Sequence, residues 1–386
     1  MYSIFDYGSM IADQVRMDAY ARALRRAVTA DSVVLDIGTG TGIFALLACQ
    51  FGARRVYAVE PSSAIEVARE IAAANGYSDR IEFMQEHSTG ITLPERADVI
   101  VSDLSGLLPW FQHHIPSIID ARQRLLAPGG ALIPRRDTVW AAMVEAPEVY
   151  ERIANVWDEA RYGLNMEAAR QVVLNTWRRA RLAPKQLLVK PQCWATLDYY
   201  RVTNNDVYAR MIWTAGRAGT AHGVGVWFDR DLSEEVHFRG APDAPENISS
   251  VIYGNVLFPL SSPVALNPGD VISLTLQANL VGDDYIWRWE TNVFDQGRAG
   301  KIKADFKQSS FFGTPLSPVQ LCKRAAGYVP TLHENGEIER LILQSMDGCA
   351  SLDDIARSVA ARFPSRFVNW QDALNRVTEL SEKFSR

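Results

Sequence analysis

Apolar and polar positions alternate in blocks along the first third of the chain, from about residue 10 to about residue 135. Short runs rich in valine, isoleucine and leucine are separated by stretches of helical length, such as 43–51 and 63–75. Strands that alternate with helices in this way form βαβ units, whose strands pair in parallel. We therefore expect a Rossmann-like α/β domain. Its predicted strands begin at Val33, Arg55, Ile81, Ala97 and Ala131.

The pattern changes twice further along the chain. A helical piece at about 147–180 precedes many short strands, which are separated by proline and glycine turns up to about residue 310 and indicate a β-barrel-like domain. Beyond about residue 320 the pattern is helical again. Ser351 has the features of an N-cap for a helix over 352–362, and a last helix is expected over 370–384.

These patterns predict three domains. Residues 1–135 would form the Rossmann-like domain, residues 136–315 the barrel-like domain with a helical arm at about 147–183, and residues 316–386 a small helical module. A linker is expected at 313–318, where glycine and proline are frequent.

Composition excludes several classes of protein. The 386 residues are 47% hydrophobic and 22% charged, as in an ordinary globular protein, and the net charge of −5 creates no basic field that would attract nucleic acid or an anionic membrane. No apolar run approaches the roughly 20 residues of a membrane span, and the first residues lack the features of a signal peptide. The four cysteines are scattered, so we expect no disulfide framework, no metal site and a cytoplasmic location.

The most informative motif is a strand that runs into an acidic residue and three alternating glycines. Asp36 is followed by Gly38, Gly40 and Gly42 before a helix begins. Glycine allows a tight turn and close contact between backbone and ligand. The spacing differs from the GxGxxG fingerprint of dinucleotide-binding proteins. It suits the amino-acid end of a cationic sulfonium ligand, so we expect S-adenosylmethionine as cofactor, with Asp36 supplying negative charge.

An acidic residue ends the next predicted strand. Glu60 stands where a carboxylate could accept hydrogen bonds from both ribose hydroxyls of the cofactor. The alternative is a surface carboxylate at a strand end. Strand, aspartate, glycines and Glu60 together favour the cofactor site.

Residues 1–310 resemble protein arginine methyltransferases. In that family a YxxF helix covers the cofactor, and Tyr2 and Phe5 have this spacing. Met10 and the sequence Asp13-Gln-Val-Arg16 match the next element, in which the arginine binds the cofactor carboxylate; the alternative for Arg16 is a solvated helix charge. The resemblance also places Ser88 near the adenine ring.

Resemblance also extends to the rest of the chain. The arm at about 147–183 is similar to the family's dimerisation arm, which implies a homodimer, and the β-rich part is similar to its substrate barrel. The last 55 residues or so resemble the PqqD-like family, some members of which bind precursor peptides by adding a strand to a sheet edge. A packing or dimerisation appendage is the alternative, and a DNA-binding role is not favoured because no basic stripe is present.

The acceptor site departs from the family pattern. A guanidinium stays protonated at neutral pH, so two carboxylates must hold it for methylation. The positions of the family's two glutamates are here Asp103, which is one methylene shorter, and Gln112, which has no charge. The family's threonine–histidine–tryptophan loop falls on residues 251–253, where no histidine remains. Loss of a buried carboxylate partner costs several kcal/mol, so we expect the acceptor not to be arginine.

Asp103, His113 and His114 are the candidate catalytic residues. We expect Asp103 to orient the acceptor or act as a base, and one of the two histidines to act as general base. The alternative is that both histidines are exposed loop residues. The expected function is methylation of a peptide or small metabolite, at oxygen or nitrogen, in a specialised pathway. Two other functions stay open, namely a non-catalytic scaffold that binds the cofactor and an arginine methyltransferase with a rebuilt clamp.

Overall fold

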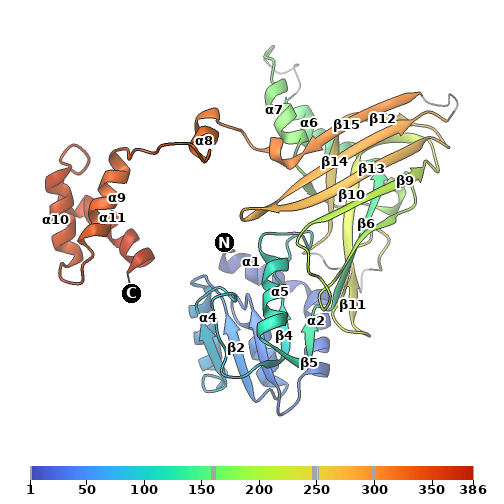
Figure 1. Cartoon of the computed structure of the whole chain (residues 1–386). Helices are drawn as coiled ribbons and strands as arrows, with labels where there is room; N and C mark the ends of the chain where they lie inside the picture. Colours follow the sequence, from blue (N-terminus) through green and yellow to red (C-terminus); the bar gives the residue numbers. More distant parts are fainter. Residues whose placement is uncertain (1, 158–161, 246–249, 251, 297–300, 386) are drawn as a thin grey trace. The chain divides into compact units, whose positions relative to one another are not determined.

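The computed structural model describes residues 2–385 except 158–161, 246–249, 251 and 297–300. The chain forms two compact units, Met1–Pro315 and Leu316–Arg386 (Figure 1). The first unit contains a parallel sheet and two antiparallel sheets, and the second is helical.

A five-stranded parallel sheet has the order β3-β2-β1-β4-β5. Every residue of the central strand β1 is buried, as expected for a parallel sheet between layers of helices. The predicted Rossmann-like domain is confirmed. The strands are β1 (Val33–Ile37), β2 (Arg55–Val59), β3 (Ile81–Met84), β4 (Ala97–Ser102) and β5 (Leu126–Ile133), and the helices are α1 (Ile4–Ala12), α2 (Gln14–Ala27), α3 (Ile43–Gln50), α4 (Ala64–Ala74) and α5 (His114–Arg124).

Two antiparallel sheets follow and confirm the barrel-like domain. One has the order β7-β12-β10-β6-β8 with β11 paired to β10, and the other the order β15-β14-β13-β9. Large aromatic side chains meet between them, including Phe258 of one sheet and the fully buried Trp287 and Trp289 of the other. The strands are β6 (Arg136–Val144), β7 (Arg178–Ala180), β8 (Gln192–Asp198), β9 (Val207–Thr214), β10 (Gly219–Asp231), β11 (His237–Arg239), β12 (Asn255–Leu266), β13 (Val271–Val281), β14 (Asp284–Phe294) and β15 (Ile302–Ser309).

The helical arm expected at about 147–183 contains α6 (Pro147–Ala154), the 3₁₀ turn η1 (Asn155–Trp157) and α7 (Glu167–Leu174). Residues 158–161 of this arm lie outside the described residues. The short turns η2 (Pro184–Gln186) and η4 (Ser310–Gly313) follow later in the chain.

The second unit consists of α8 (Pro318–Lys323), α9 (Glu334–Ser345), α10 (Leu352–Arg362) and α11 (Trp370–Phe384). Ser351 forms the expected capping box with Asp354 at the start of α10. Within residues 316–385, all of which are described, no strand is present, so this unit offers no sheet edge to which a peptide could add a strand. The PqqD-like resemblance stays a prediction.

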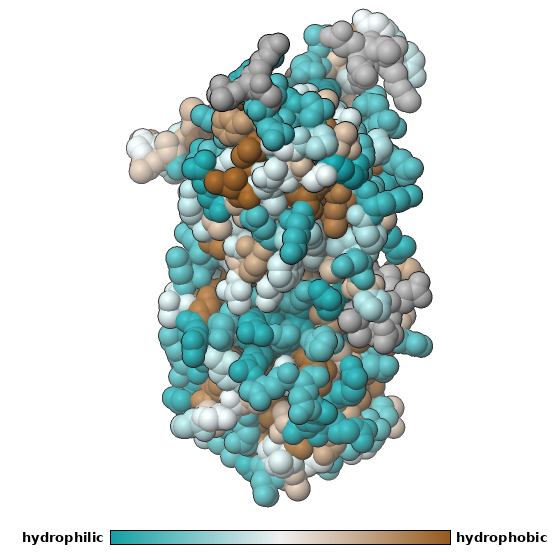
Figure 2. Space-filling view, turned by 90° about the vertical axis from the view of Figure 1, so that its right-hand side faces the viewer, coloured by the Kyte–Doolittle hydropathy of each residue, from teal (hydrophilic) through white to brown (hydrophobic). Residues whose placement is uncertain are grey.

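The surface agrees with the composition. A space-filling view of one face shows mostly hydrophilic residues, with smaller hydrophobic patches between them (Figure 2). None of the helices in the described part of the chain is long and apolar enough to cross a membrane.

Candidate active site

Three glycines turn the chain at the carboxyl end of β1. Gly38, Gly40 and Gly42 have φ angles of +73°, +54° and +86°, which are left-handed values that favour glycine. A Cβ atom on Gly40 would lie 2.3 Å from the ring of Tyr7 in α1, and one on Gly38 would lie 2.4 Å from the side chain of Leu104. Neighbouring segments thus pack directly onto the loop, and no larger residue fits.

Asp36 is the last residue but one of β1, beside this loop, and is fully buried. Its Oδ2 accepts hydrogen bonds from Thr39 Oγ1 at 2.6 Å and from the Ala45 amide at 3.0 Å. Its Oδ1 has no partner among the described residues. Burial raises the pKa of Asp36 to about 7. A buried oxygen without a partner is costly, so this carboxylate is suited to a cationic ligand.

Glu60 follows β2 and is also buried. Its carboxylate accepts hydrogen bonds from the Gly40 amide at 3.1 Å and the Ser62 amide at 3.0 Å, which hold it beside the glycine loop. Ser88 is buried as well, and its carbonyl accepts a hydrogen bond from Arg124 Nη2 at 3.1 Å. The roles of Glu60 and Ser88 toward ribose and adenine stay predictions.

The N-terminal helix α1 has no buried residue. The side chain of Tyr2 is 47% exposed and that of Phe5 is 81% exposed, so their covering role stays a prediction. Met10 contributes its carbonyl, which accepts a hydrogen bond from Arg16 Nη1 at 3.1 Å. The residue that packs on the glycine loop is Tyr7, which the sequence analysis missed. Its signal was a second aromatic side chain in the same short helix, two residues after Phe5.

Arg16 and Asp103 form a buried ion pair. Arg16 Nη2 lies 2.5 Å and Nε 2.7 Å from Asp103 Oδ2, and the guanidinium also contacts the rings of Tyr20 and Phe44. Asp103 directly follows β4, at the carboxyl edge where α/β sheets bind ligands. The sequence singled out both residues for separate roles, and the structure joins them.

A second arginine contacts Asp103 from the barrel. Arg230 in β10 is completely buried, and its Nη1 donates a hydrogen bond to Asp103 Oδ1 at 2.9 Å. Its Nε and Nη2 hold the two oxygens of Asp137 in β6 at 2.8 and 2.7 Å, and Nη2 also reaches Ser105 Oγ at 2.8 Å. We call the four charged residues of these ion pairs the charge cluster, namely Arg16, Asp103, Arg230 and Asp137.

Two tyrosine hydroxyls contact the carboxylates of the charge cluster. Tyr253 Oη lies 2.5 Å from the Asp103 carboxylate, and Tyr199 Oη donates to Asp137 at 2.6 Å. Burial by itself would raise the pKa of Asp103, but Arg16 and Arg230 outweigh burial and hold this pKa below its usual range. Both oxygens of Asp103 are therefore occupied by groups of the chain itself, which suits a positioning group better than a base.

The sequence analysis did not find Arg230 and Asp137. A signal was present, because each stands in phase with the buried apolar face of its strand. Asp137 shares a face with Val139 and Ala141, and Arg230 shares one with Phe228. A charged residue in such a register marks a buried charge that needs a partner.

The two candidate histidines lie in different environments. His113 is exposed, and its Nε2 contacts Asp283 at 3.1 Å. His114 is buried, with its Nδ1 2.9 Å from the Pro109 carbonyl, and burial lowers its pKa to about 4. No hydrogen bond joins either ring to Asp103 among the described residues, so their role as bases stays a prediction. Gln112, at the second glutamate position, is exposed.

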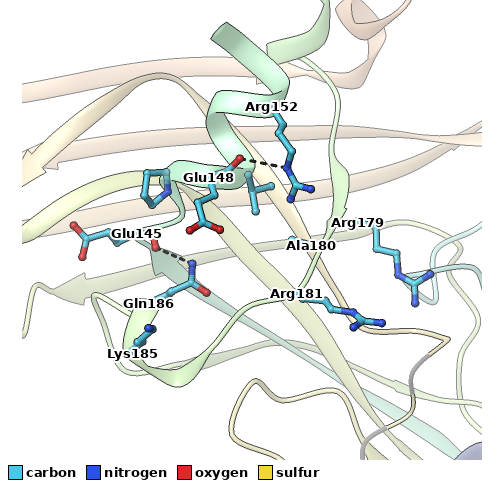
Figure 3. Close-up of a pocket in the computed structure, with 10 residues that line it drawn as sticks. Glu145, Glu148, Arg152, Arg179, Ala180, Arg181, Lys185 and Gln186 are labelled. Carbon is cyan, nitrogen blue, oxygen red and sulfur yellow. Dashed lines mark hydrogen bonds between the residues drawn. The ribbon is translucent and has the colours of Figure 1, made fainter. Parts of the chain in front are cut away.

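A cavity of about 870 Å³ lies elsewhere on the barrel domain, beside α6 and η2 (Figure 3). It contains no residue of the glycine loop or the charge cluster, so it does not belong to the cofactor site. Its charged lining residues are Glu145, Glu148, Arg152, Arg179, Arg181 and Lys185.

Comparison with known proteins assigns this architecture. Residues 20–147 match the family described as ribosomal protein L11 methyltransferase (PrmA), and residues 135–292 match the arginine methyltransferase oligomerization subdomain. Protein arginine N-methyltransferase 6 of Xenopus tropicalis is 32% identical over 231 residues, which cover 57% of this chain and 68% of that protein. The chain belongs to the protein arginine methyltransferase family.

Other family members give the same result. Protein arginine N-methyltransferase PRMT10 of Oryza sativa subsp. japonica is 29% identical over 312 residues, which cover 70% of this chain and 80% of the relative. The solved structure of Arabidopsis thaliana protein arginine methyltransferase 10 has a TM-score of 0.70 at 25% identity and covers 80% of this chain and 97% of its own. A Trypanosoma brucei PRMT1 enzyme–prozyme structure with AdoHcy, at TM-score 0.69 and 22% identity, has the same fold over 78% of this chain and 96% of its own.

As a member of this family, the protein is an S-adenosylmethionine-dependent methyltransferase. The residues at the carboxyl edge of the sheet fit this cofactor. The free Oδ1 of Asp36 can accept from a cationic group, and the left-handed glycines allow close backbone approach. Arg16 and Glu60 provide a cation and a buried carboxylate at the same edge.

Proposed function

We propose that this methyltransferase acts on an acceptor other than arginine, either a small metabolite or a peptide, at oxygen or nitrogen. The observation that carries the proposal is the saturation of Asp103. Arg16, Arg230 and Tyr253 already occupy both of its carboxylate oxygens.

Arginine methylation makes a demand that this arrangement does not meet. An incoming guanidinium needs two carboxylates, because it is charged and must leave water. The second glutamate position is Gln112, which is exposed and uncharged. A guanidinium at Asp103 would also meet two arginines, and like charges in a buried site repel strongly. A neutral acceptor avoids both costs.

The transfer chemistry asks for positioning. S-adenosylmethionine supplies a methyl group that its sulfonium centre already activates. Asp36, Glu60 and Arg16 would hold the cofactor beside the glycine loop, on which Tyr7 packs. Asp103 would act indirectly, by holding Arg16, Arg230 and Tyr253 in place beside the acceptor, so that the accepting atom lies in line for transfer. The proton of an alcohol or amine acceptor would leave through a base, for which His113 and His114 stay the candidates.

Two other functions have support of their own. The relatives are named as arginine N-methyltransferases, which supports methylation of arginine through a rebuilt clamp. The pairing of Arg16 with Asp103 supports a non-catalytic scaffold, because it neutralises a group that would serve the cofactor.

Transfer of labelled methyl groups separates these functions. Purified protein with labelled S-adenosylmethionine is offered an arginine-rich peptide, lysine- and serine-containing peptides, and pools of small alcohols, acids and amines. We expect S-adenosylhomocysteine to form with an acceptor from the non-arginine set and no methylarginine after hydrolysis of the peptide. Methylarginine would overturn the proposal in favour of the rebuilt clamp. Absence of turnover with every acceptor would favour the scaffold.

We also propose that the arm at 147–183 makes the protein a homodimer. The match of residues 135–292 to an oligomerization subdomain and the exposure of Tyr162, 92% in the isolated chain, support this. Analytical ultracentrifugation tests it, and a mass of one chain at micromolar concentration would contradict it. The cytoplasmic location and the specialised pathway stay predictions.

A further inference from the structure

Asp103 lies beside the cofactor loop. The next residue, Leu104, packs against Gly38, and the partner of Asp103, Arg16, contacts the ring of Phe44 in α3, the helix that follows the loop. An acceptor must approach the methyl group of the cofactor within contact distance. An arginine acceptor held by Asp103 would therefore occupy the space on its barrel side, which is where Arg230 lies.

The guanidinium of Arg230 is held as a bound guanidinium ligand would be. Its Nε and Nη2 bind Asp137 in a two-point contact, and its Nη1 binds Asp103, so two carboxylates flank one cation. Ser105 Oγ accepts a further hydrogen bond from Nη2. The side chain is 0% exposed, so no part of it remains for contact with solvent. Two carboxylates of the chain itself therefore already bind the guanidinium of Arg230.

This pair crosses between adjacent strands. Arg230 and Asp137 are direct partners in the antiparallel register of β10 and β6. Both stand on otherwise apolar faces, where hydrophobic residues of similar volume would be equally or more stabilising. A need for stability therefore does not explain the pair, whereas a role in the acceptor site does.

We infer that Arg230 is an internal guanidinium that fills the acceptor clamp and excludes arginine side chains from it. The inference deepens the proposed function, on which it rests, by naming the residue that sets the acceptor class. Removal of Arg230 leaves Asp103 and Asp137 facing a vacant space, and this is a site for a guanidinium from outside.

Titration tests the inference without reliance on turnover. The full chain, loaded with S-adenosylhomocysteine, is titrated with a short glycine-rich peptide that carries one arginine, and with the same peptide carrying lysine instead. We expect Arg230→Ala to bind the arginine peptide at least about tenfold more tightly than the wild type does, because a charge-assisted two-carboxylate contact becomes available. The lysine peptide should gain little, since it lacks the forked geometry.

Arg136→Ala is the matched control. Arg136 precedes Asp137 in β6 and pairs with Asp231, but it is half exposed, so its removal should leave peptide affinity at the wild-type value. Circular dichroism shows whether Arg230→Ala is folded. If it is not, the variant is refolded with millimolar guanidinium chloride or with ammonium chloride. We expect guanidinium to restore the folded spectrum by occupying the space between Asp103 and Asp137 and ammonium not to, and equal results with the two salts would overturn the inference.

The outcomes separate the two claims. A folded Arg230 variant with no gain for the arginine peptide, or with an equal gain for the lysine peptide, overturns the role of Arg230 and leaves the proposed function standing. Wild-type protein that already binds the arginine peptide as tightly as the variant also overturns it. Methylarginine formation by the wild type defeats the proposed function, which the transfer assay detects independently.

Discussion

The carboxyl edge of the parallel sheet has two sides that differ in how their polar groups are satisfied. On the glycine-loop side, Asp36 has a buried oxygen without a partner among the described residues. On the barrel side, Asp103 and Arg230 are bound to each other and to further residues of the chain. The difference teaches that a site kept for a ligand retains polar groups that only the ligand can satisfy. A site whose groups are satisfied internally has lost or changed its ligand.

The first prediction concerns the glycine-loop side, where a larger residue should block cofactor binding. Gly40→Arg should abolish S-adenosylmethionine binding, because its Cβ would lie 2.3 Å from Tyr7 and a non-glycine residue is strained at φ +54°. Isothermal titration measures the loss. Gly76→Arg is the control, since Gly76 has φ +73° but no atom within 4 Å of its Cβ position. Retained micromolar binding by Gly40→Arg would place the cofactor elsewhere.

The second prediction concerns a substitution that disrupts the charge cluster. Asp137→Leu leaves the buried Arg230 with one carboxylate fewer and should cost about 3–5 kcal/mol in the free energy of unfolding. Asp137→Leu/Arg230→Leu removes both charges and should lie within about 1 kcal/mol of the wild type. Urea denaturation of both variants provides the measurement. A double variant that is as unstable as Asp137→Leu, or less stable, would show that the cost does not come from the charge left without its partner.

These two sides also differ in how well the sequence predicted them. The cofactor side is contiguous from Asp36 to Gly42, and its conformation follows from glycine and strand patterns that are local. The charge cluster joins Arg16, Asp103, Asp137 and Arg230, which are distant along the chain. Their meeting depends on the register of β6 and β10, which no local pattern specifies. The Rossmann-like and barrel-like domains were therefore predictable from the sequence, whereas the contact between Arg230 and Asp103 was not. The altered acceptor site stays a prediction.

The third prediction sharpens the role of Asp36. Burial raises its pKa from 3.8 to about 7, so the carboxyl group of Asp36 stays protonated in the folded protein up to nearly neutral pH. If the carboxylate receives the cationic cofactor, the affinity should fall about tenfold for each pH unit below 7. Titration at pH 6 and pH 8 measures the change. Asp36→Asn should bind more weakly and with little dependence on pH, and an unchanged slope in this variant would assign the titration to another group.

The fourth and smallest effect concerns His114. Burial lowers its pKa from 6.5 to about 4, so between these values the unfolded chain takes up a proton that the folded chain does not. Stability from this group is present above pH 6.5 and is lost as pH falls, by about 1 kcal/mol at pH 5.5. His114→Gln should remove that part of the pH dependence of unfolding, whereas His113→Gln, on the exposed ring, should not. A loss of methyl transfer in His113→Gln alone would assign the base to that residue.

Asp13 ends α1 and begins α2, and its carboxylate also accepts hydrogen bonds from Ser250 Oγ at 2.6 Å and the Ile252 amide at 2.9 Å. The barrel thereby anchors the start of α2. The helix α1 beyond this joint buries none of its residues. Asp13 is therefore the joint at which the barrel fixes the start of α2, so the position of Arg16 depends on a contact made outside the Rossmann-like domain.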